Sequence, residues 1–438
     1  MNLLKWLYPG MRVKRWLALA LAGLVLAAVG LDLLSGGRLA GNFATAINQF
    51  GLLFKEGFYQ RGLFGFLVFA AGLVILGNGL LKTFYSLAAA LMPEQEKQVA
   101  DIIYARRNLR RGPKIVVIGG GTGLSVLLRG LKKYTSNLTA VVAVTDDGGS
   151  SGRLRGELGI LPPGDIRNCL VALADKEPLM EVLLQYRFPA GKLAGHNVGN
   201  LLLAALNDVS GGFKQAVQGL SKVLAVRGQV LPVTLADVAL CAELADGTVV
   251  QGESNIPRSL QPVQRVFLKP ARCFPPHEVL AAIREADAVV LGPGSLYTSI
   301  IPNLLVRGIP EALAKSRAVK IYVCNLMTQP GETIGYTVCD HLKAIFDHAG
   351  QVVDCVVVNT GPMPSRLLDR YRQEGAEPVE PILAEIKKLG VLAVTENLVM
   401  QTEAIRHHPE KLALTVLRMI FATRHRIERV SYLNNYRK

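Results

Sequence analysis

The chain has 438 residues, of which 49 are lysine or arginine and 34 are aspartate or glutamate, for a net charge of +15. Residues 1–113 hold 13 basic and 5 acidic residues, a balance of +8, so only +7 is spread over the remaining 325 residues. Residues 114–438 contain neither interleaved basic and aromatic residues nor a helix-turn-helix pattern. We therefore expect no nucleic-acid partner and favour a site for a small anion. The six cysteines form no C-x-x-C pair, and no histidine has zinc-ligand spacing, so neither disulfides nor a structural metal is expected.

Two apolar stretches near the amino terminus are long enough to cross a membrane. Trp16 to Leu34 contains one charge, Asp32, and Gly62 to Leu81 contains none. Both match the roughly 20 residues that span a bilayer as a helix. Four basic residues precede the first stretch, three lie between the two and six follow the second, so the positive-inside rule predicts both chain ends in the cytoplasm. A cleaved signal peptide is the alternative for the first stretch, and the second stretch argues against it.

These observations divide the chain into four parts. We predict a membrane anchor of two transmembrane helices (1–92), a basic juxtamembrane linker (93–113), a nucleotide-binding domain (114–426) and a basic tail (427–438). The linker should contact anionic lipid. The expected location is the cell membrane, multi-pass, with the main domain in the cytoplasm.

The domain begins with a strand, a glycine turn and a helix. Ile115 to Ile118 are apolar and mostly β-branched, as in a strand buried on both faces, and apolar residues recur at helical spacing after the glycines. Free N–H groups at a helix start favour a phosphate, and glycines leave it room. A purely structural turn is the alternative, because Leu124 replaces the third glycine of G-x-G-x-x-G. The candidate phosphate-binding residues are Gly119, Gly120, Gly121, Thr122 and Gly123.

A pair of aspartates follows the next predicted strand, Leu138 to Val144. At the carboxyl edge of a dinucleotide-binding sheet an acidic residue holds a ribose. The two carboxylates could instead bind Mg²⁺, which takes carboxylate and phosphate oxygens together, so Asp146 and Asp147 are the alternative metal ligands. A simple turn is the third interpretation. The candidate residues of this motif are Asp146, Asp147, Gly148, Gly149, Ser150 and Arg153.

Two polar motifs then open apolar helices. In Leu161-Pro-Pro-Gly-Asp-Ile-Arg-Asn168 the aspartate is predicted to cap the helix, and an arginine in the first turn is unfavourable unless an anion lies near it. His196-Asn-Val-Gly-Asn200 suits hydrogen bonds to a sugar or phosphate, or only a helix cap. The candidates are Asp165, Arg167, Asn168, His196, Asn197 and Asn200.

An antiparallel hairpin interrupts the alternation of strands and helices. Val238 to Leu244 and Thr248 to Glu253 flank Asp246-Gly247, which is a strong hairpin signal, and Arg265 to Leu268 could add a third strand. We predict a small antiparallel insertion in the α/β body.

The later strands end in glycine, asparagine or proline. Ala288 to Leu291 precedes a second glycine turn, Gly292-Pro-Gly-Ser-Leu-Tyr-Thr-Ser299, which predicts a second anion-binding helix end. Val319 to Cys324 and Val352 to Val358 are followed by asparagines, Asn325 and Asn359, that could donate to the same ligand. The candidates are Gly292, Gly294, Ser295 and Asn325. The fold class expected is therefore α/β, a Rossmann-like mostly parallel sheet with a small antiparallel insertion, preceded by two transmembrane helices.

Eight motifs in a fixed order carry a family resemblance. They are GGGTGLSVLLRGLK, TDDGGSSGRLR, PPGDIRN, GHNVGN, QGESNIP, GPGSLYTSI, VCNLMTQPGET and VVNTGP. Together they resemble the gluconeogenesis-factor (YvcK-like) family, a branch of the superfamily that contains 2-phospho-L-lactate transferase (CofD-like). The resemblance covers about Lys114 to His408. The transferase branch carries a Pro-Asp-Leu-Asp-Thr-type segment where this chain has Pro-Gly-Asp-Ile-Arg-Asn, so transfer of phospholactate to a deazaflavin is not expected.

The resemblance implies a ligand and a role. The ligand would be a UDP-sugar such as UDP-N-acetylglucosamine, and the role would be regulation of cell shape and envelope synthesis during growth on gluconeogenic carbon. It also implies that Tyr371 and Arg406 belong to the sugar-nucleotide site, where a tyrosine can stack on a base and an arginine can hold a diphosphate. A helix-packing tyrosine and a surface arginine are the alternatives. The two predicted spans depart from the usual soluble form of the family.

Three functional hypotheses follow. The first is a membrane-tethered, cytoplasm-facing UDP-sugar sensor without catalytic residues, because the sequence offers no evident nucleophile or general base. The second is a metal-assisted transferase that uses Asp146, Asp147 and Asp165 around Mg²⁺ and a nucleotide phosphate. The third is NAD(P)-dependent oxidoreduction. A homo-oligomer is compatible with all three.

Overall fold

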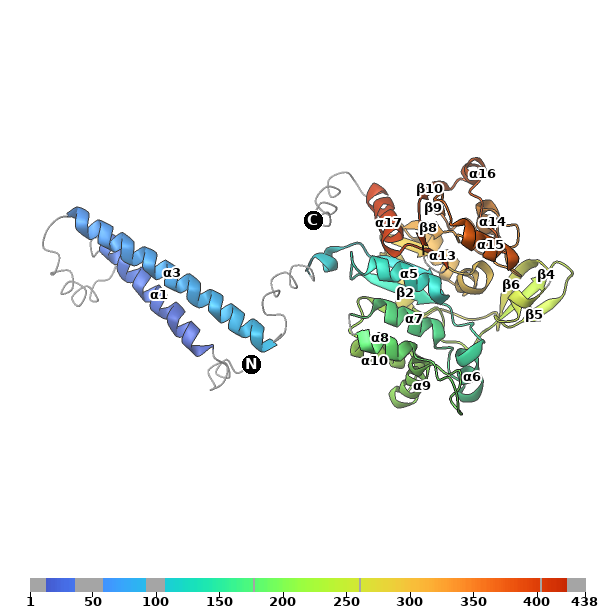
Figure 1. Cartoon of the computed structure of the whole chain (residues 1–438), viewed down its shortest axis with the longest axis horizontal. Coiled ribbons are helices and arrows are strands. Elements are labelled where there is room, and N and C mark those ends of the chain that lie inside the picture. The colour runs from blue at the N-terminus through green and yellow to red at the C-terminus, as the bar shows by residue number, and fades with distance from the viewer. Residues whose placement is uncertain are drawn as a thin grey trace. The chain divides into compact units, whose positions relative to one another are not determined.

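The computed structural model describes residues 13–35, 58–91, 107–175, 178–259, 261–401 and 404–423. It contains two compact units, Met1–Arg107 and Asn108–Lys438 (Figure 1). The predicted basic tail (427–438) and residues 93–106 of the predicted linker lie outside the described part of the chain.

The first unit is an antiparallel pair of helices, α1 (Lys14–Leu34) and α3 (Phe58–Leu91). Small residues let the two backbones touch, since a Cβ on Gly72 would lie 2.3 Å from the backbone nitrogen of Ala27. Glycines at positions 23, 30 and 79 meet the opposite helix in the same way. Both helices are long and apolar enough to cross a membrane.

The second unit is built on a seven-stranded sheet in which every pair of neighbouring strands is parallel. The strand order is β10-β9-β8-β7-β1-β2-β3. The strands are β1 (Ile115–Gly119), β2 (Leu138–Val142), β3 (Gln229–Pro232), β7 (Ala288–Leu291), β8 (Val319–Val323), β9 (Cys355–Asn359) and β10 (Leu392–Glu396). The order reverses between β1 and β7, which is the topological switch point of a doubly wound fold. The predicted Rossmann-like fold class is confirmed.

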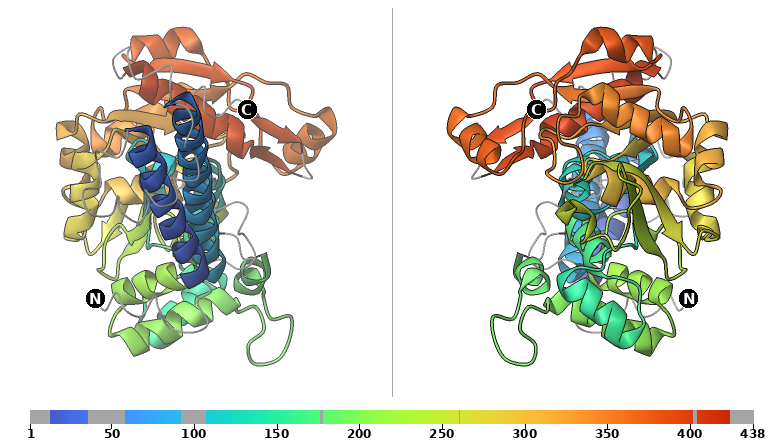
Figure 2. Two further views of the ribbon diagram at one scale, coloured as in Figure 1. Left: turned by 90° about the vertical axis from the view of Figure 1, so that its left-hand side faces the viewer. Right: turned by 90° about the vertical axis from the view of Figure 1, so that its right-hand side faces the viewer.

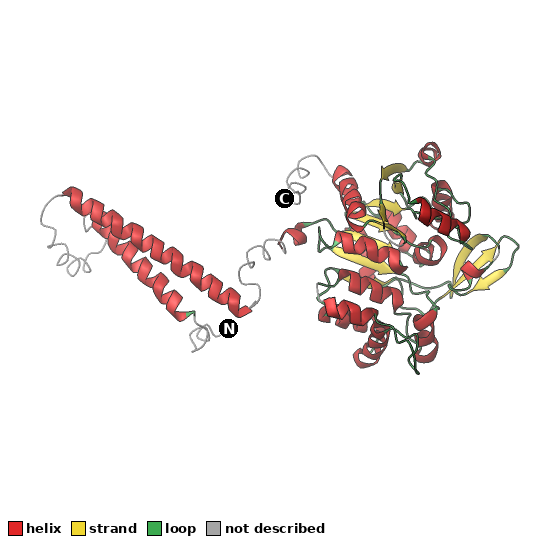
Figure 3. Cartoon of the chain, viewed as in Figure 1, coloured by secondary structure: helices red, strands yellow, loops and turns green. Residues whose placement is uncertain are grey.

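Helices enclose the sheet (Figure 3). Every residue of β1, β2 and β7 is buried, so both faces of the sheet centre must be covered. The helices are α5 (Gly121–Leu131), α6 (Gly149–Leu158), α7 (Gly164–Leu173), α8 (Pro178–Gln185), α9 (Val198–Ser210), α10 (Phe213–Val223), α11 (His277–Glu285), α12 (Ile301–Leu304), α13 (Ile309–Lys315), α14 (Val338–Ala349), α15 (Ser365–Gln373), α16 (Leu383–Lys388) and α17 (Pro409–Thr423). Helices α5, α7 and α17 form one packed group, and α12 contacts β1, α13 and α14.

Two small antiparallel sheets complete the domain. The predicted insertion is a three-stranded sheet of order β5-β4-β6, formed by β4 (Ala239–Leu244), β5 (Val249–Gln251) and β6 (Val263–Lys269). It stands apart from the main sheet in Figure 1 and faces the viewer in the right-hand view of Figure 2. A 3₁₀ turn, Ile256–Arg258, connects β5 to β6. The second sheet, β11 (Val399–Gln401) with β12 (Ile405–His407), has no counterpart among the sequence predictions.

Candidate functional site

A crevice of about 660 Å³ opens at the carboxyl ends of the parallel strands. It contains both glycine turns, the ones that follow β1 and β7, and therefore lies at the switch point. Its volume falls within the range of small-molecule sites. The predicted site residues that line it are Gly120, Gly121, Thr122, Gly123, Asp146, Asp165, Gly294, Ser295, Asn325, Tyr371 and Arg406. Their contact with a ligand stays a prediction.

The two glycine turns pack directly against each other. A Cβ on Gly123 would lie 2.6 Å from the carbonyl oxygen of Pro293, and one on Gly294 would lie 3.3 Å from the carbonyl oxygen of Gly120. Gly292, at a φ of +79°, and Gly119 lie behind this contact rather than in the crevice. Glycine is thus needed here for backbone contact between two turns as well as for access to a ligand.

The start of α5 already holds an anionic side chain of the protein. Asp165 accepts a hydrogen bond from the backbone N–H of Gly121, and a Cβ on Gly120 would lie 2.6 Å from its Oδ2 atom. The prediction that Asp165 caps α7 is wrong, because the helix begins at Gly164 with Pro163 at the cap position. The Gly164 N–H instead donates to Ser151 Oγ at 3.1 Å, which leaves Asp165 free to reach the glycine turn.

Carboxyl groups form one wall of the crevice. Burial and the neighbouring Asp146 raise the pKa of Asp165 to about 6. Burial and the carboxylates Asp146, Asp165, Glu332 and Asp147 raise the pKa of Glu253 to about 8. Glu332 does not line the crevice, but burial raises its pKa to about 7 as well, although this carboxylate accepts a hydrogen bond from Thr298 Oγ1. At neutral pH the wall therefore carries fewer charges than its composition suggests.

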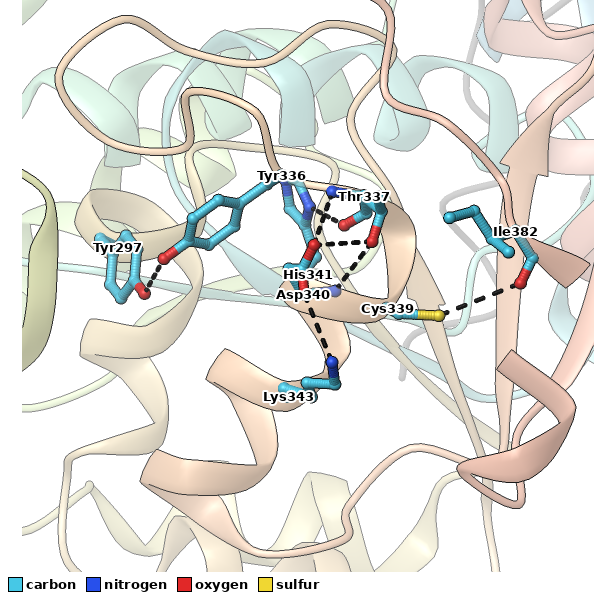
Figure 4. A network of polar contacts seen from close by, with 8 residues as sticks. All are labelled: Tyr297, Tyr336, Thr337, Cys339, Asp340, His341, Lys343 and Ile382. Carbon is cyan, nitrogen blue, oxygen red and sulfur yellow. Dashed lines mark hydrogen bonds and ion pairs between the residues drawn. The ribbon is translucent and has the colours of Figure 1, made fainter. Parts of the chain in front are cut away.

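The loop after β8, residues 325–330, also lines the crevice. Gln329 Nε2 donates to Ser295 Oγ at 2.8 Å, which ties this loop to the second glycine turn. The hydroxyls of Tyr336 and Tyr297 lie 2.9 Å apart (Figure 4). With the hydrogen bond from Thr298 to Glu332, three such links join residues 329–336 to the segment that follows β7.

The loop ends at a well-defined helix start, also drawn in Figure 4. Thr337 and Asp340 form a capping box at the start of α14, in which each side chain bonds the backbone N–H of the other residue. His341 Nδ1 lies 2.8 Å from the carbonyl oxygen of Thr337. This local order anchors the segment that follows the crevice-lining loop.

Two of the predicted residues come from elements near the end of the chain. Tyr371 lies on α15 and packs partly against the core, and Arg406 is exposed on β12 between two buried residues, Ile405 and His407. Burial lowers the pKa of His407 to about 4, and its Nε2 atom is buried without a hydrogen-bond partner. A neutral histidine and an exposed arginine thus lie side by side at the crevice edge.

The remaining candidates form a hydrogen-bonded network outside the crevice. Ser150 Oγ lies 3.2 Å from His196 Nδ1. Asn197 caps α9, and Arg167 donates to Asn200 Oδ1 at 3.0 Å and to Asn168 Oδ1 at 2.6 Å. Arg153 donates to the carbonyl oxygen of Ala194 at 2.9 Å. These contacts hold the segment around residues 194–200 against α6 and α7.

Asp146 and Asp147 are adjacent in the chain but have different surroundings. Asp146 lines the crevice and accepts from the N–H of Gly148 at 2.9 Å. Asp147 accepts from the N–H of Ser254 at 2.9 Å and so ties the sheet edge to the insertion. Gly148 and Gly149 begin α6 and do not line the crevice. Among the described residues, no group of three His, Cys, Asp or Glu is arranged to hold a metal ion.

The second predicted helix end is not a regular one. The segment after Ser295 is a π-helical turn, Leu296–Ile300, followed by the short helix α12. Pro302 has no N–H to donate to the carbonyl four residues earlier, so a regular α-helix cannot run through this point. Asn303 instead donates to the carbonyl oxygens of Gly119 and Ser299 and joins the two turns.

Sequence reasoning missed part of the crevice. The additional lining residues are Val126, Glu253, Pro293, Ser299, Leu326, Met327, Thr328, Gln329, Pro330, Glu374, Ala376, Ile405 and His407. Glu253 and Gln329 lie within motifs that carried the family resemblance, and that was the one available signal. Asn359 does not line the crevice, because its Oδ1 accepts from Gly361 and Leu398.

A doubly wound sheet with paired glycine turns at its switch point defines a Rossmann-like protein. The family model for 2-phospho-L-lactate transferase CofD matches residues 115–399. The gluconeogenesis factor of Bacillus subtilis is 52% identical over 304 residues, which are 69% of this chain and 96% of that protein. A relative from Nostoc sp. is 48% identical over 434 residues, or 96% of this chain and 93% of that protein.

A solved structure agrees. A crystal structure of a upf0052-family member from Bacillus halodurans matches with a TM-score of 0.68 and 50% identity, over 70% of this chain and 99% of that one. The chain therefore belongs to the CofD family and, within it, to the gluconeogenesis factors. A match to 96% of this chain includes most of residues 1–113, so the amino-terminal segment is shared with some relatives.

Proposed function

We propose that this protein is a nucleotide-sugar-binding regulator. A UDP-sugar such as UDP-N-acetylglucosamine would occupy the crevice and adjust envelope synthesis and cell shape during growth on gluconeogenic carbon. The supporting observation is the crevice at the switch point, where open α/β sheets bind nucleotides, together with the family membership. Tyr371 offers a ring for base stacking, and Arg406 offers a fork for a diphosphate.

Ligand-dependent thermal unfolding tests this proposal. The full chain is heated in mild detergent with UDP-N-acetylglucosamine, UDP, GDP or NAD. A ligand present at 100 times its Kd adds about 2.7 kcal/mol to the free energy of unfolding. Stabilisation by the UDP compounds alone, lost in Arg406→Ala and kept in Arg418→Ala, supports the proposal. No stabilisation at millimolar ligand contradicts it, as does a nucleotide other than a UDP-sugar in the mass spectrum of the purified protein.

The location is part of the same proposal. Helices α1 and α3 would cross the membrane as a hairpin and hold the domain in the cytoplasm, with anionic lipid at the basic linker. We expect the full chain to stay in the membrane pellet after alkaline carbonate extraction. We also expect added protease to digest the domain only in inverted vesicles. Release by carbonate argues against it.

The second candidate is a Mg²⁺-dependent transferase. The carboxyl groups of the crevice favour it. Asp146, Asp165 and Glu253 line a site proposed for an anionic ligand, and a bound cation would relieve the repulsion between these carboxylates and the ligand. Mg²⁺ would take Asp146 and Asp165 together with ligand phosphates. Mg²⁺-dependent turnover of a nucleotide that is lost in Asp146→Asn supports this candidate. If no product forms from any nucleotide in a panel, the candidate is removed. In the same panel, a change in the absorbance of NAD(P)H tests for NAD(P)-dependent oxidoreduction, and no change argues against it.

A further inference from the structure

Helix α8 has two apolar faces. One face packs inward through Met180 and Leu184, and Leu184 is only 1% exposed. The other face points to solvent, with residues at the spacing i, i+3, i+4 and i+7 that makes one stripe along a helix. The α8 stripe consists of Leu179, Val182 and Leu183 on the helix and Tyr186, the residue that directly follows its end.

The α8 stripe is unusually open for apolar side chains. Leu179 is 80% exposed, Val182 is 67% exposed, and Leu183 and Tyr186 are each 47% exposed. The ring of Phe188 lies edge-on to that of Tyr186, at 5.4 Å between centroids, and extends the surface. The stripe presents on the order of 500 Å² of accessible surface, as much as the largest apolar patch of a typical monomer, and such patches are often functional.

The α8 stripe contains no charge. The one acidic residue described on this helix, Glu181, forms an ion pair with Arg129 of α5 at 2.9 Å. Its carboxylate is therefore held by the same chain. Two such stripes can approach each other without bringing like charges together.

The stripe is also self-complementary. Leu179, at the start of the helix, and Tyr186, just past its end, are equally far in sequence from the midpoint between Val182 and Leu183. When two α8 helices pair antiparallel across a two-fold axis, Leu179 meets the Tyr186 position and Val182 meets the Leu183 position. This self-matching is the requirement of an isologous interface.

We propose that the α8 stripe is the contact surface between two copies of this chain. Two stripes together remove on the order of 1,000 Å² from solvent, which is near the lower limit for a specific interface. The expected assembly is a reversible two-fold dimer. It depends on neither the ligand of the crevice nor the membrane hairpin.

Cross-linking tests which surface is in contact. The six native cysteines are all buried, so a single engineered thiol reports on its own position. Val182→Cys lies next to the proposed axis, and the control Val223→Cys, at a site that is 71% exposed on α10, lies outside the stripe. With a short bismaleimide, the full chain in mild detergent should give a cross-linked dimer several-fold more often for Val182→Cys. Equal yields for the two variants overturn the proposal.

A mass measurement tests the dimer itself. Light scattering of the full chain, with the detergent mass subtracted, should show two chains at high concentration. Val182→Asp should raise the dimer dissociation constant at least about 100-fold, because a charge would be buried without a partner, while Val223→Asp leaves it unchanged. Circular dichroism should show that both variants stay folded. A one-chain mass at every concentration overturns the proposal, as does an unchanged dimer dissociation constant in Val182→Asp.

Discussion

Replacing Glu253 by glutamine should make the protein more stable at alkaline pH. Glu253 follows β5 of the insertion and enters the crevice beside other carboxylates. Burial and those carboxylates raise its pKa to about 8, against 4.5 in the unfolded chain. Between these two values the folded protein keeps the proton and the unfolded chain releases it. The folded state then binds more protons, so stability falls as the pH rises, until both states are ionised above about pH 8.

The size of this effect follows from the two pKa values. A difference of about 3.5 units corresponds to roughly 4.8 kcal/mol when both states are ionised. Part of the Glu253 side chain meets solvent, which screens the repulsion, so we expect about half of the ideal change. The wild-type chain should therefore lose about 2 kcal/mol more than Glu253→Gln between pH 5.5 and pH 8.5.

Urea unfolding followed by circular dichroism at a series of pH values measures the difference. The matched control is Glu374→Gln, which removes a carboxylate of the same crevice from an exposed position after α15. Because Asp165 and Glu332 also have raised pKa values, some slope should remain in every variant. Parallel curves for the wild type and Glu253→Gln would refute the electrostatic reasoning.

Three further changes probe the glycine turns, the crevice edge and the helix pair. Gly123→Ala should destabilise the domain by about 1–3 kcal/mol in urea unfolding, since its Cβ would strike the facing glycine turn, whereas Gly156→Ala, on α6 with open space, should be neutral or stabilising. Arg406→Ala should weaken binding of a UDP-sugar by 10- to 100-fold in calorimetry, and an unchanged Kd would remove the arginine from the site. Gly72→Leu should separate α1 from α3, measured as faster proteolysis of the hairpin, while Gly62→Leu, with nothing within 4 Å, should not.

The strands and turns were predictable because their signals are local. Ile115 to Ile118 and Ala288 to Leu291 are short apolar runs followed by glycines, and both are strands of the parallel sheet. Asp246-Gly247 marked the hairpin between β4 and β5 in the same way. The start of α7 was misjudged by two residues, because the cap position is Pro163 and the helix already includes Gly164 before Asp165.

The membership of the crevice was less predictable. Asp146 and Asp147 are adjacent in the chain, yet only the first lines the crevice, and the second bonds the backbone of the insertion. Glu253 reaches the crevice from that insertion, about one hundred residues later. Alternate directions of neighbouring side chains and contacts between distant segments cannot be read from a local pattern.

The sequence by itself determined the class of fold, the place of the two glycine turns at strand ends, and two helices apolar enough for a membrane, because each depends on residue spacing within one segment. Tertiary structure decided which carboxylates share one wall and why Gly123 must be a glycine, since the carbonyl that excludes its Cβ belongs to Pro293. The physical reason is that burial and close packing depend on atoms brought together from both halves of the sheet.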